Sequence, residues 1–139
     1  MDLPPPLLEA GRRQHVDGLA PSATQEYFSP PGRCYRLFAC TWAPTASSCG
    51  AVFILHGLQE HCLRYALLAE GLAAAGYWVH GLDHVGFGRS EGRRGGLGNL
   101  PWEAFVEDAA AFVEHARASY AQADLPLFLF GRKCAVAYA

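Results

Sequence analysis

Three short stretches of the chain are almost entirely apolar and cover residues 51–57, 77–83 and 125–131. A continuous apolar run of this length is typical of a strand buried on both faces, as the strands of a parallel sheet are. Between these stretches, residues 64–76 and 102–120 carry apolar side chains at three- and four-residue steps, the spacing of a helix with one buried face. The alternation of strands and helices predicts an α/β chain with a parallel sheet.

The beginning of the chain has a different character. Residues 1–24 are rich in Pro, Gly, Arg and Ser without periodicity, which predicts a flexible leader. Two apolar-rich stretches, residues 27–28 and 34–42, flank a Pro-Pro-Gly turn, and this arrangement predicts two short strands. We therefore expect a leader over residues 1–24 and a folded region over residues 25–139.

Composition narrows the class of protein. Of 139 residues, 51% are hydrophobic and 17% charged, and the net charge is -2, which indicates a globular domain without a nucleic-acid partner. The five cysteines are irregularly spaced and form no CxxC pair, so neither a disulfide scaffold nor a zinc site is predicted. The chain shows no signal-peptide pattern and no membrane-length apolar run. We expect a cytoplasmic protein, and contact with a membrane surface stays open.

Motifs follow the first two predicted parallel strands. Residues 56–65 read HGLQEHCLRY, residues 68–79 follow the pattern LAxxLAxxGYWV, and residues 83–92 read DHVGFGRSEG. In this order the motifs resemble the α/β-hydrolase family, and within it the monoacylglycerol lipases and their esterase, lysophospholipase and serine aminopeptidase-like relatives. The resemblance spans roughly residues 50–131. It implies a truncated α/β-hydrolase fold, the N-terminal half of the domain, with a mostly parallel sheet and flanking helices.

The resemblance also implies roles for individual residues. The backbone N–H of Leu58 would donate to the oxyanion that forms when an ester carbonyl is attacked. We call the loop that carries Leu58 the oxyanion loop. Arg64 and Tyr65 match a pair at a helix start that braces this loop. The positions expected to shape the site are His56, Gly57, Asp83, Gly86, Gly88 and Gly131.

The last predicted strand runs into the place of the nucleophile elbow, a strand–turn–helix written G-x-S-x-G. In this chain Gly131 is present, but Lys133 stands at the serine position and Ala135 at the last glycine. The N–H of Cys134 would be the second oxyanion donor by resemblance. Residues 134–139 are predicted to begin a helix.

Other nucleophiles are weak candidates. Lys133 would need a greatly lowered pKa, and its attack on an ester would give a stable amide. Moving the elbow to Cys134 would put Arg132 and Val136 at flanking positions that need small residues. Ser90 lies in a G-R-S-E-G match, but it follows its strand at a distance and opens no helix. No intact catalytic nucleophile is therefore predicted.

The family's remaining triad members, Asp and His, follow the nucleophile in sequence, and the sequence ends at Ala139 without them. Asp108 and His115 lie upstream and are not assigned to the triad. We expect an inactive, truncated or alternatively spliced relative of enzymes that hydrolyse lipid esters. The alternative is a non-catalytic fragment that binds an acyl ligand or pairs with another chain through residues 127–131.

Metal and cofactor sites are not predicted. Histidines 56, 61, 80 and 84 lack metal-binding spacing. The glycine-rich residues 86–92 do not match the dinucleotide-binding fingerprint G-x-G-x-x-G, because the third glycine comes one position late and no helix is predicted to follow directly. The expected partner is thus a lipid ester, by resemblance alone.

Overall fold

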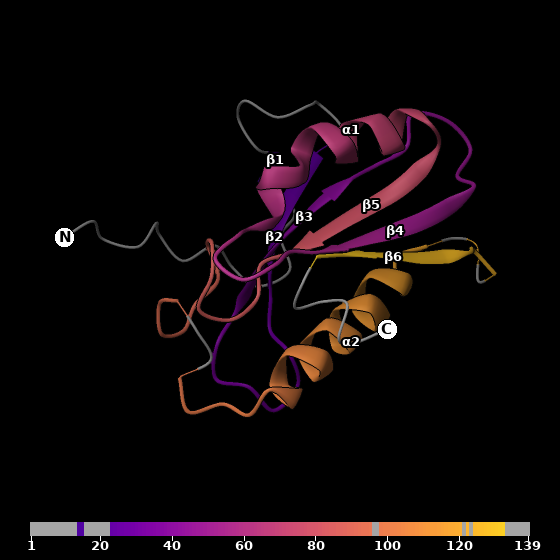
Figure 1. Cartoon of the computed structure of the whole chain (residues 1–139). Coiled ribbons are helices and arrows are strands. Elements are labelled where there is room, and N and C mark those ends of the chain that lie inside the picture. The colour runs from indigo at the N-terminus through magenta and orange to yellow at the C-terminus, as the bar shows by residue number, and fades with distance from the viewer. Residues whose placement is uncertain (1–13, 16–22, 96–97, 121, 123, 133–139) are drawn as a thin grey trace.

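The computed structural model describes residues 14–15, 23–95, 98–120, 122 and 124–132 (Figure 1). Six strands form one sheet in the order β1-β2-β3-β5-β4-β6. The strands are β1 (Gln14–His15), β2 (Ala23–Phe28), β3 (Leu37–Trp42), β4 (Gly50–Leu55), β5 (Tyr77–Leu82) and β6 (Leu127–Gly131). A short 3-10 helix η1 (Cys62–Tyr65) leads into α1 (Ala66–Ala74), and α2 (Glu103–Arg117) follows β5.

The sheet is mixed, and its parallel part carries the predicted motifs. β4 pairs in parallel with β5 on one side and with β6 on the other. The pairs β1–β2, β2–β3 and β3–β5 are antiparallel. Helix α1 covers one face of the sheet and α2 the other (Figure 1). The predicted α/β-hydrolase fold is confirmed, with its parallel strands at β5, β4 and β6.

Both faces of β4 are buried, which explains why its sequence is continuously apolar rather than alternating. Phe53 packs with Phe105 and Phe112 of α2. The next residue, Ile54, points to the opposite face and packs with Ala69 of α1. Successive side chains of a strand alternate between faces, so a strand between two helix layers needs apolar residues at every position.

The predicted elements agree with the structure in place and type, and their ends differ by a few residues. The first predicted helix divides into η1 and α1, and Gly76, with a φ of +98°, follows it in the left-handed conformation expected after a helix. Most of the predicted leader lies outside the described residues. Gln14–His15 and the start of β2 at Ala23 belong to the sheet, so the sheet extends further toward the N-terminus than the sequence indicates. Among the residues that the structure describes, no helix has the length and apolar character needed to cross a membrane.

Strand β6 forms an edge of the described sheet. It pairs with β4 and is the last strand in the order. Its four large apolar side chains, Leu127 to Phe130, are 36–60% exposed. Within the described residues, this edge strand therefore presents apolar side chains and an unpaired backbone edge to solvent.

Candidate active site

The ends of the three parallel strands meet at one edge of the sheet, as expected for a doubly covered parallel sheet. The N–H of Arg132, just after β6, donates to the carbonyl of Leu55 at the end of β4, 3.3 Å away. The N–H of His84, just after β5, donates to Nε2 of His56 at 2.9 Å. The loops predicted to shape the site are thus in direct contact.

His56 fixes the loop that follows β4. Its ring is buried, and Nδ1 lies 2.7 Å from the carbonyl of Gly57. Because Nε2 accepts from the His84 N–H, Nδ1 carries the proton and donates to Gly57. Burial lowers the pKa of His56, which keeps the ring neutral. Both nitrogens are engaged with backbone, so His56 is an architectural residue and not a metal ligand.

Glu60 holds the same loop through a set of contacts that we call the brace, and this role was not predicted from the sequence. Its Oε2 accepts from the Tyr65 hydroxyl at 2.6 Å and from the Gly57 N–H at 3.0 Å. Oε1 lies 3.4 Å from Arg132 and 3.9 Å from Arg64. The hydrogen bond from Tyr65, followed by that from Gly57, lowers the pKa of Glu60. Arg64 and Tyr65 therefore contact the oxyanion loop through the Glu60 carboxylate. The signal in the sequence that could have indicated this role is the acidic residue within HGLQEH.

The brace engages the Gly57 amide but not the backbone amide of the next residue, Leu58. Among the described residues, the N–H of Leu58 has no hydrogen-bond partner. Gln59 follows with a φ of +60°, a conformation that non-glycine residues rarely adopt and that is common where a loop is held for function. The geometry is compatible with an oxyanion donor at Leu58, and this role stays a prediction.

Asp83 organises the loop after β5. The buried carboxylate accepts from the Cys62 N–H at 2.6 Å and from the Arg89 N–H at 2.9 Å. Gly88 allows this approach because a Cβ atom there would lie 2.1 Å from Oδ2 of Asp83, and its φ is +51°. Asp83 therefore joins η1 to the glycine-rich loop. Its predicted role in shaping an active site stays a prediction.

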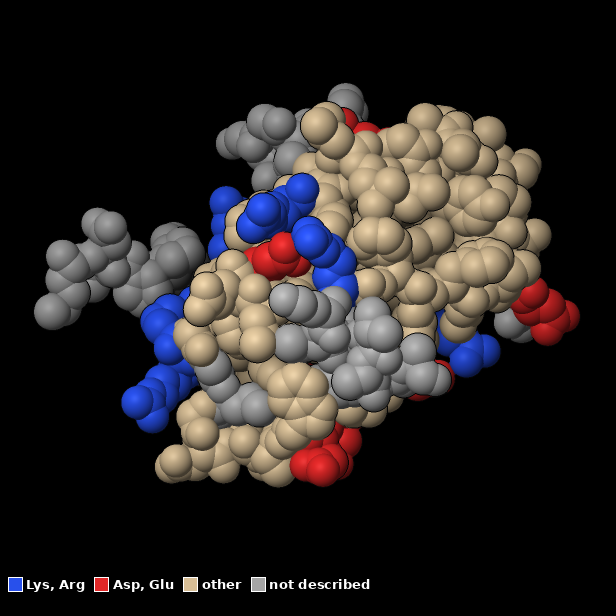
Figure 2. Space-filling model, viewed as in Figure 1, with Lys and Arg blue, Asp and Glu red and all other residues tan. Residues whose placement is uncertain are grey.

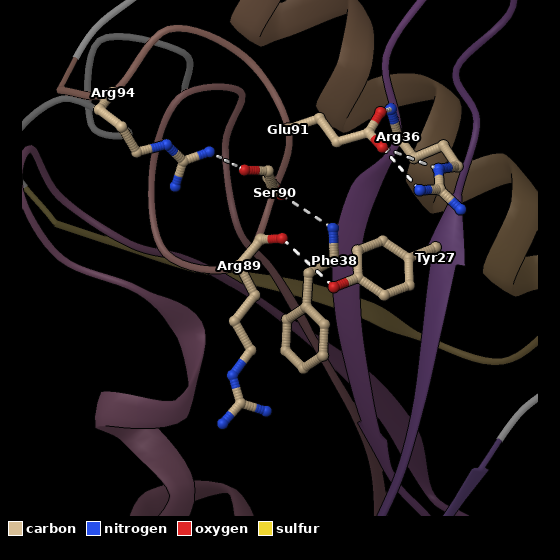
Figure 3. Close-up of polar contacts among 7 residues, drawn as sticks. All are labelled: Tyr27, Arg36, Phe38, Arg89, Ser90, Glu91 and Arg94. Atoms are coloured by element: carbon tan, nitrogen blue, oxygen red, sulfur yellow. Dashed lines mark hydrogen bonds and ion pairs between the residues drawn. The ribbon is translucent and has the colours of Figure 1, made fainter. Parts of the chain in front are cut away.

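Ser90 is a structural residue of the same loop. It is 1% exposed, its Oγ accepts from the Phe38 N–H at 2.8 Å, and its hydroxyl donates to the carbonyl of Asp83 at 2.5 Å. Arg94 donates to the backbone carbonyl of Ser90. Figure 3 shows Ser90 pointing at the Phe38 amide. With its hydroxyl buried and bonded to backbone, Ser90 does not have the exposure that an elbow serine needs.

The rest of this loop is attached to the antiparallel part of the sheet (Figure 3). Glu91 accepts from the Arg36 N–H at 2.7 Å and from its guanidinium at 2.6 Å, which lowers the pKa of Glu91. The Tyr27 hydroxyl donates to the carbonyl of Arg89 at 3.4 Å. These contacts attach the glycine-rich loop to β2 and to the residues before β3.

His84 and the upstream acid Asp108 are buried and serve packing and bracing. His84 is buried against His56 and Phe105, and burial, with a smaller effect of His56, lowers its pKa to about 3. Asp108 accepts hydrogen bonds from Arg33 and Tyr35, so its carboxylate holds the segment before β3 to α2. No group of three or more metal-binding side chains occurs in the part of the chain that the structure describes.

Two predicted positions lie outside the described residues: Lys133 at the serine position and Cys134 as the second oxyanion donor. The helix predicted to begin at Cys134 lies there too. Gly131 matches the first glycine of the G-x-S-x-G pattern. It ends β6 at the edge of the sheet where β4 also ends.

An open hollow of about 410 Å³ lies away from this site, at the amino ends of β4 and β6. Its lining is mainly polar and comes from connecting segments: Ser48, Cys49, Gln122, Asp124, Leu125 and Pro126. The parallel strands place their carboxyl ends at the opposite edge, so this hollow is not part of the candidate site.

Comparison with known proteins identifies the family and the fold. Monoglyceride lipase of Mus musculus is 37% identical over 95 residues, covering 68% of this chain and 30% of that protein. Monoacylglycerol lipase of Mycolicibacterium smegmatis is 41% identical over 78 residues, covering 56% and 27%. A thermostable carboxyl esterase from Bacillus coagulans, solved in complex with glycerol, has the same fold, with a TM-score of 0.71 and 24% identity over 84% of this chain and 39% of that one.

The chain thus spans about 30% of the length of the curated relatives that it matches. The family model described as serine aminopeptidase, S33, matches residues 46–132, which include both braced loops and all of β6. This match ends at Arg132, one residue before Lys133. The chain belongs to the serine aminopeptidase S33 family.

Proposed function

We propose that this chain binds a lipid ester at the carboxyl-end edge of its sheet and does not hydrolyse it by serine catalysis. The relatives' names, monoglyceride and monoacylglycerol lipase, support an acylglycerol as the ligand class. In such enzymes a serine attacks the ester carbonyl, and backbone N–H groups stabilise the resulting oxyanion. Here Lys133 takes the place of that serine.

The observation that carries the binding half of this proposal is the brace around Glu60. One carboxylate holds the Gly57 amide and the Tyr65 hydroxyl and lies near Arg132, so the oxyanion loop and the end of β6 are tied together. A loop held this way keeps its geometry without a ligand, which reduces the ordering cost of binding. The Leu58 amide would then meet the ester carbonyl oxygen, while Lys133 stands in the sequence where the attacking serine would be.

Two measurements test the two halves separately. A fluorophosphonate probe, which labels activated serines, is expected to leave the chain unlabelled, while a monoglyceride lipase run in parallel is labelled. Isothermal titration with a non-hydrolysable ether analogue of a monoacylglycerol is expected to show binding. Labelling that disappears in Ser90→Ala would overturn the inactive half, and absence of heat with the ether analogue would overturn the binding half.

A second candidate function is assembly with another chain through β6. The exposed apolar side chains and unpaired backbone edge of β6 favour it, because edge strands pair readily with further strands. Sedimentation velocity over a concentration series distinguishes the two: a chain that only binds lipid stays at one mass, and a chain that pairs through β6 increases in mass with concentration.

A further inference from the structure

Positive charge is concentrated around the candidate site. The segments 56–65, 83–95 and 131–132 contain five arginines and three carboxylates, which leaves six basic and ten acidic residues for the rest of the chain. The site edge is therefore positive in a chain of net charge -2. The five are Arg64, Arg89, Arg93, Arg94 and Arg132, and we call them the arginine rim. Figure 2 shows basic atoms gathered on the side of the molecule where β4, β5 and β6 end.

The rim is continuous across segments that are far apart in sequence. A Cβ atom at Gly88 would lie 2.9 Å from His61, so the loop carrying Arg89 touches the oxyanion loop. Arg132 lies against the other side of that loop, 3.6 Å from a Cβ atom placed at Gly57. The N–H of Arg64 donates to the carbonyl of His61. The segments of Arg64, Arg89 and Arg132 thus surround one loop, residues 57–61, while Arg94 donates to the carbonyls of Gly88 and Ser90 on the adjoining glycine-rich loop.

The carboxylates of this region do not cancel the rim. Asp83 is buried and bonded to backbone amides. Glu91 is paired with Arg36, which lies outside the rim. Glu60 is shared between Arg64 and Arg132 and is itself mostly buried, whereas each of these arginine side chains is 61% exposed. The charge that this edge presents to solvent is therefore positive.

Exposed leucines lie beside the rim. Leu58, at the tip of the surrounded loop, is 56% exposed, and Leu67 on α1 is 85% exposed. Leu67 and Leu68 follow Arg64 by three and four residues, so they share its face of the helical segment. Figure 2 shows a broad surface with few charged atoms over α1, next to the basic atoms of the edge.

We propose that the arginine rim, with Leu58, Leu67 and Leu68, binds the surface of a membrane that contains anionic phospholipids. Arginine pairs with phosphate oxygens in bidentate geometry, and leucines next to a basic surface insert into the boundary between headgroups and acyl chains. A basic surface alone would suit any polyanion, and the exposed leucines favour lipid. This inference goes beyond the proposed function, since it needs neither hydrolysis nor a bound ester.

Vesicle flotation with the full chain tests the proposal. The chain is expected to float with vesicles of phosphatidylcholine containing about 30% phosphatidylserine, and not with phosphatidylcholine alone. Binding should weaken strongly at 1 M salt, where the Debye length is about 3 Å. The double variant Arg89→Gln, Arg93→Gln is expected to lower the partition coefficient about 25-fold, since each arginine near an anionic surface contributes roughly fivefold.

Matched variants separate membrane binding from attraction to polyanions in general. Arg117→Gln removes an exposed arginine of α2, outside the rim, and should leave the partition coefficient unchanged. Leu67→Ser should lower it without changing the charge. Three outcomes overturn the proposal: no preference for anionic vesicles, an unchanged coefficient in the double variant, or an unchanged coefficient in Leu67→Ser, which would indicate a general polyanion site. Circular dichroism confirms that each variant, changed only at the surface, remains folded.

Discussion

The loops at the carboxyl ends of β4 and β5 differ from the edge strand β6 in how far their groups are paired or buried. At the carboxyl ends, the amides and carboxylates of the loops are paired with one another, as Asp83 is with the amides of Cys62 and Arg89. On β6, Phe128 and Leu129 remain at least half exposed. The carboxylates that hold these loops are thus fully paired, whereas β6 presents an open edge within the described part of the sheet.

This difference indicates where the stability of the chain resides. Buried polar groups that are fully bonded become costly when one partner is removed, because the other partner stays buried. Exposed apolar side chains contribute little when they are changed. Substitutions in the loops are therefore expected to have large effects on unfolding, and substitutions on β6 small effects on unfolding and clear effects on association.

Gly88→Ala is expected to destabilise the protein most. The new Cβ atom would lie 2.1 Å from Oδ2 of Asp83, on a backbone whose φ is +51°. Overlap and backbone strain together should lower the free energy of unfolding by about 3–5 kcal/mol. Urea denaturation followed by circular dichroism measures this loss.

Gly95→Ala is the matched control for this change. Its φ is +82°, but nothing lies within 4 Å of the added Cβ atom, so only backbone strain of about 1 kcal/mol is expected. Equal losses in the two variants would mean that the contact between Gly88 and Asp83 does not hold the loop, and the contrast with β6 would then lose its basis.

Among the loop substitutions, Ser90→Ala should have the next largest effect. It leaves the buried N–H of Phe38 and the carbonyl of Asp83 without their partner, which costs about 2 kcal/mol of unfolding free energy. Thermal and urea denaturation measure it. Ser48→Ala, which removes an exposed hydrogen bond to Gln122, should change the free energy by less than about 0.5 kcal/mol. A neutral Ser90→Ala would argue that the hydroxyl was free for another role.

The sequence was informative where local pattern decides the structure. The apolar runs located β4, β5 and β6, and the helical spacing located α2, because both reflect burial against neighbouring layers. The motif after β4 located a loop, whose role in binding an oxyanion stays a prediction, and the context of Ser90 indicated a loop residue. These features are carried by residues close together in the chain.

Features that depend on distant partners were not predicted. The role of Glu60 rests on Tyr65, on the Gly57 amide and on Arg132, which is 72 residues away. The antiparallel pairing of β3 with β5 brings together strands separated by β4 in sequence, and no local signal specifies that choice. The start of β2 at Ala23 was missed because polar Thr24 and Gln25 mask its alternation.

The pH dependence of stability provides a third test of the loop region. Burial lowers the pKa of His84 to about 3, whereas the ordinary value is 6.5. Between these values the unfolded chain binds a proton that the folded chain does not, so stability falls as the pH decreases from 6.5 toward 3. His84 alone should contribute a slope of about 1.4 kcal/mol per pH unit in this window.

His84→Leu is expected to reduce that slope, as measured by urea denaturation at several pH values between 4 and 7. Denaturation of both proteins between pH 7 and 8, above the window set by the two pKa values of His84, is the control, and there the slopes of variant and wild type should agree. An unchanged slope in His84→Leu would show that the ring is accessible to protons in the folded protein, contrary to its burial between His56 and Phe105.

Leu129→Lys should have the smallest effect on unfolding, less than about 0.5 kcal/mol, because the side chain on β6 is already 60% exposed. Leu82→Lys, at a fully buried position of β5, should cost more than about 3 kcal/mol. A lysine on an edge strand opposes pairing with another strand, so Leu129→Lys should also abolish any increase of sedimentation coefficient with concentration. If association persists unchanged in this variant, β6 is not the contact surface, and the open edge would differ from the braced loops in exposure alone.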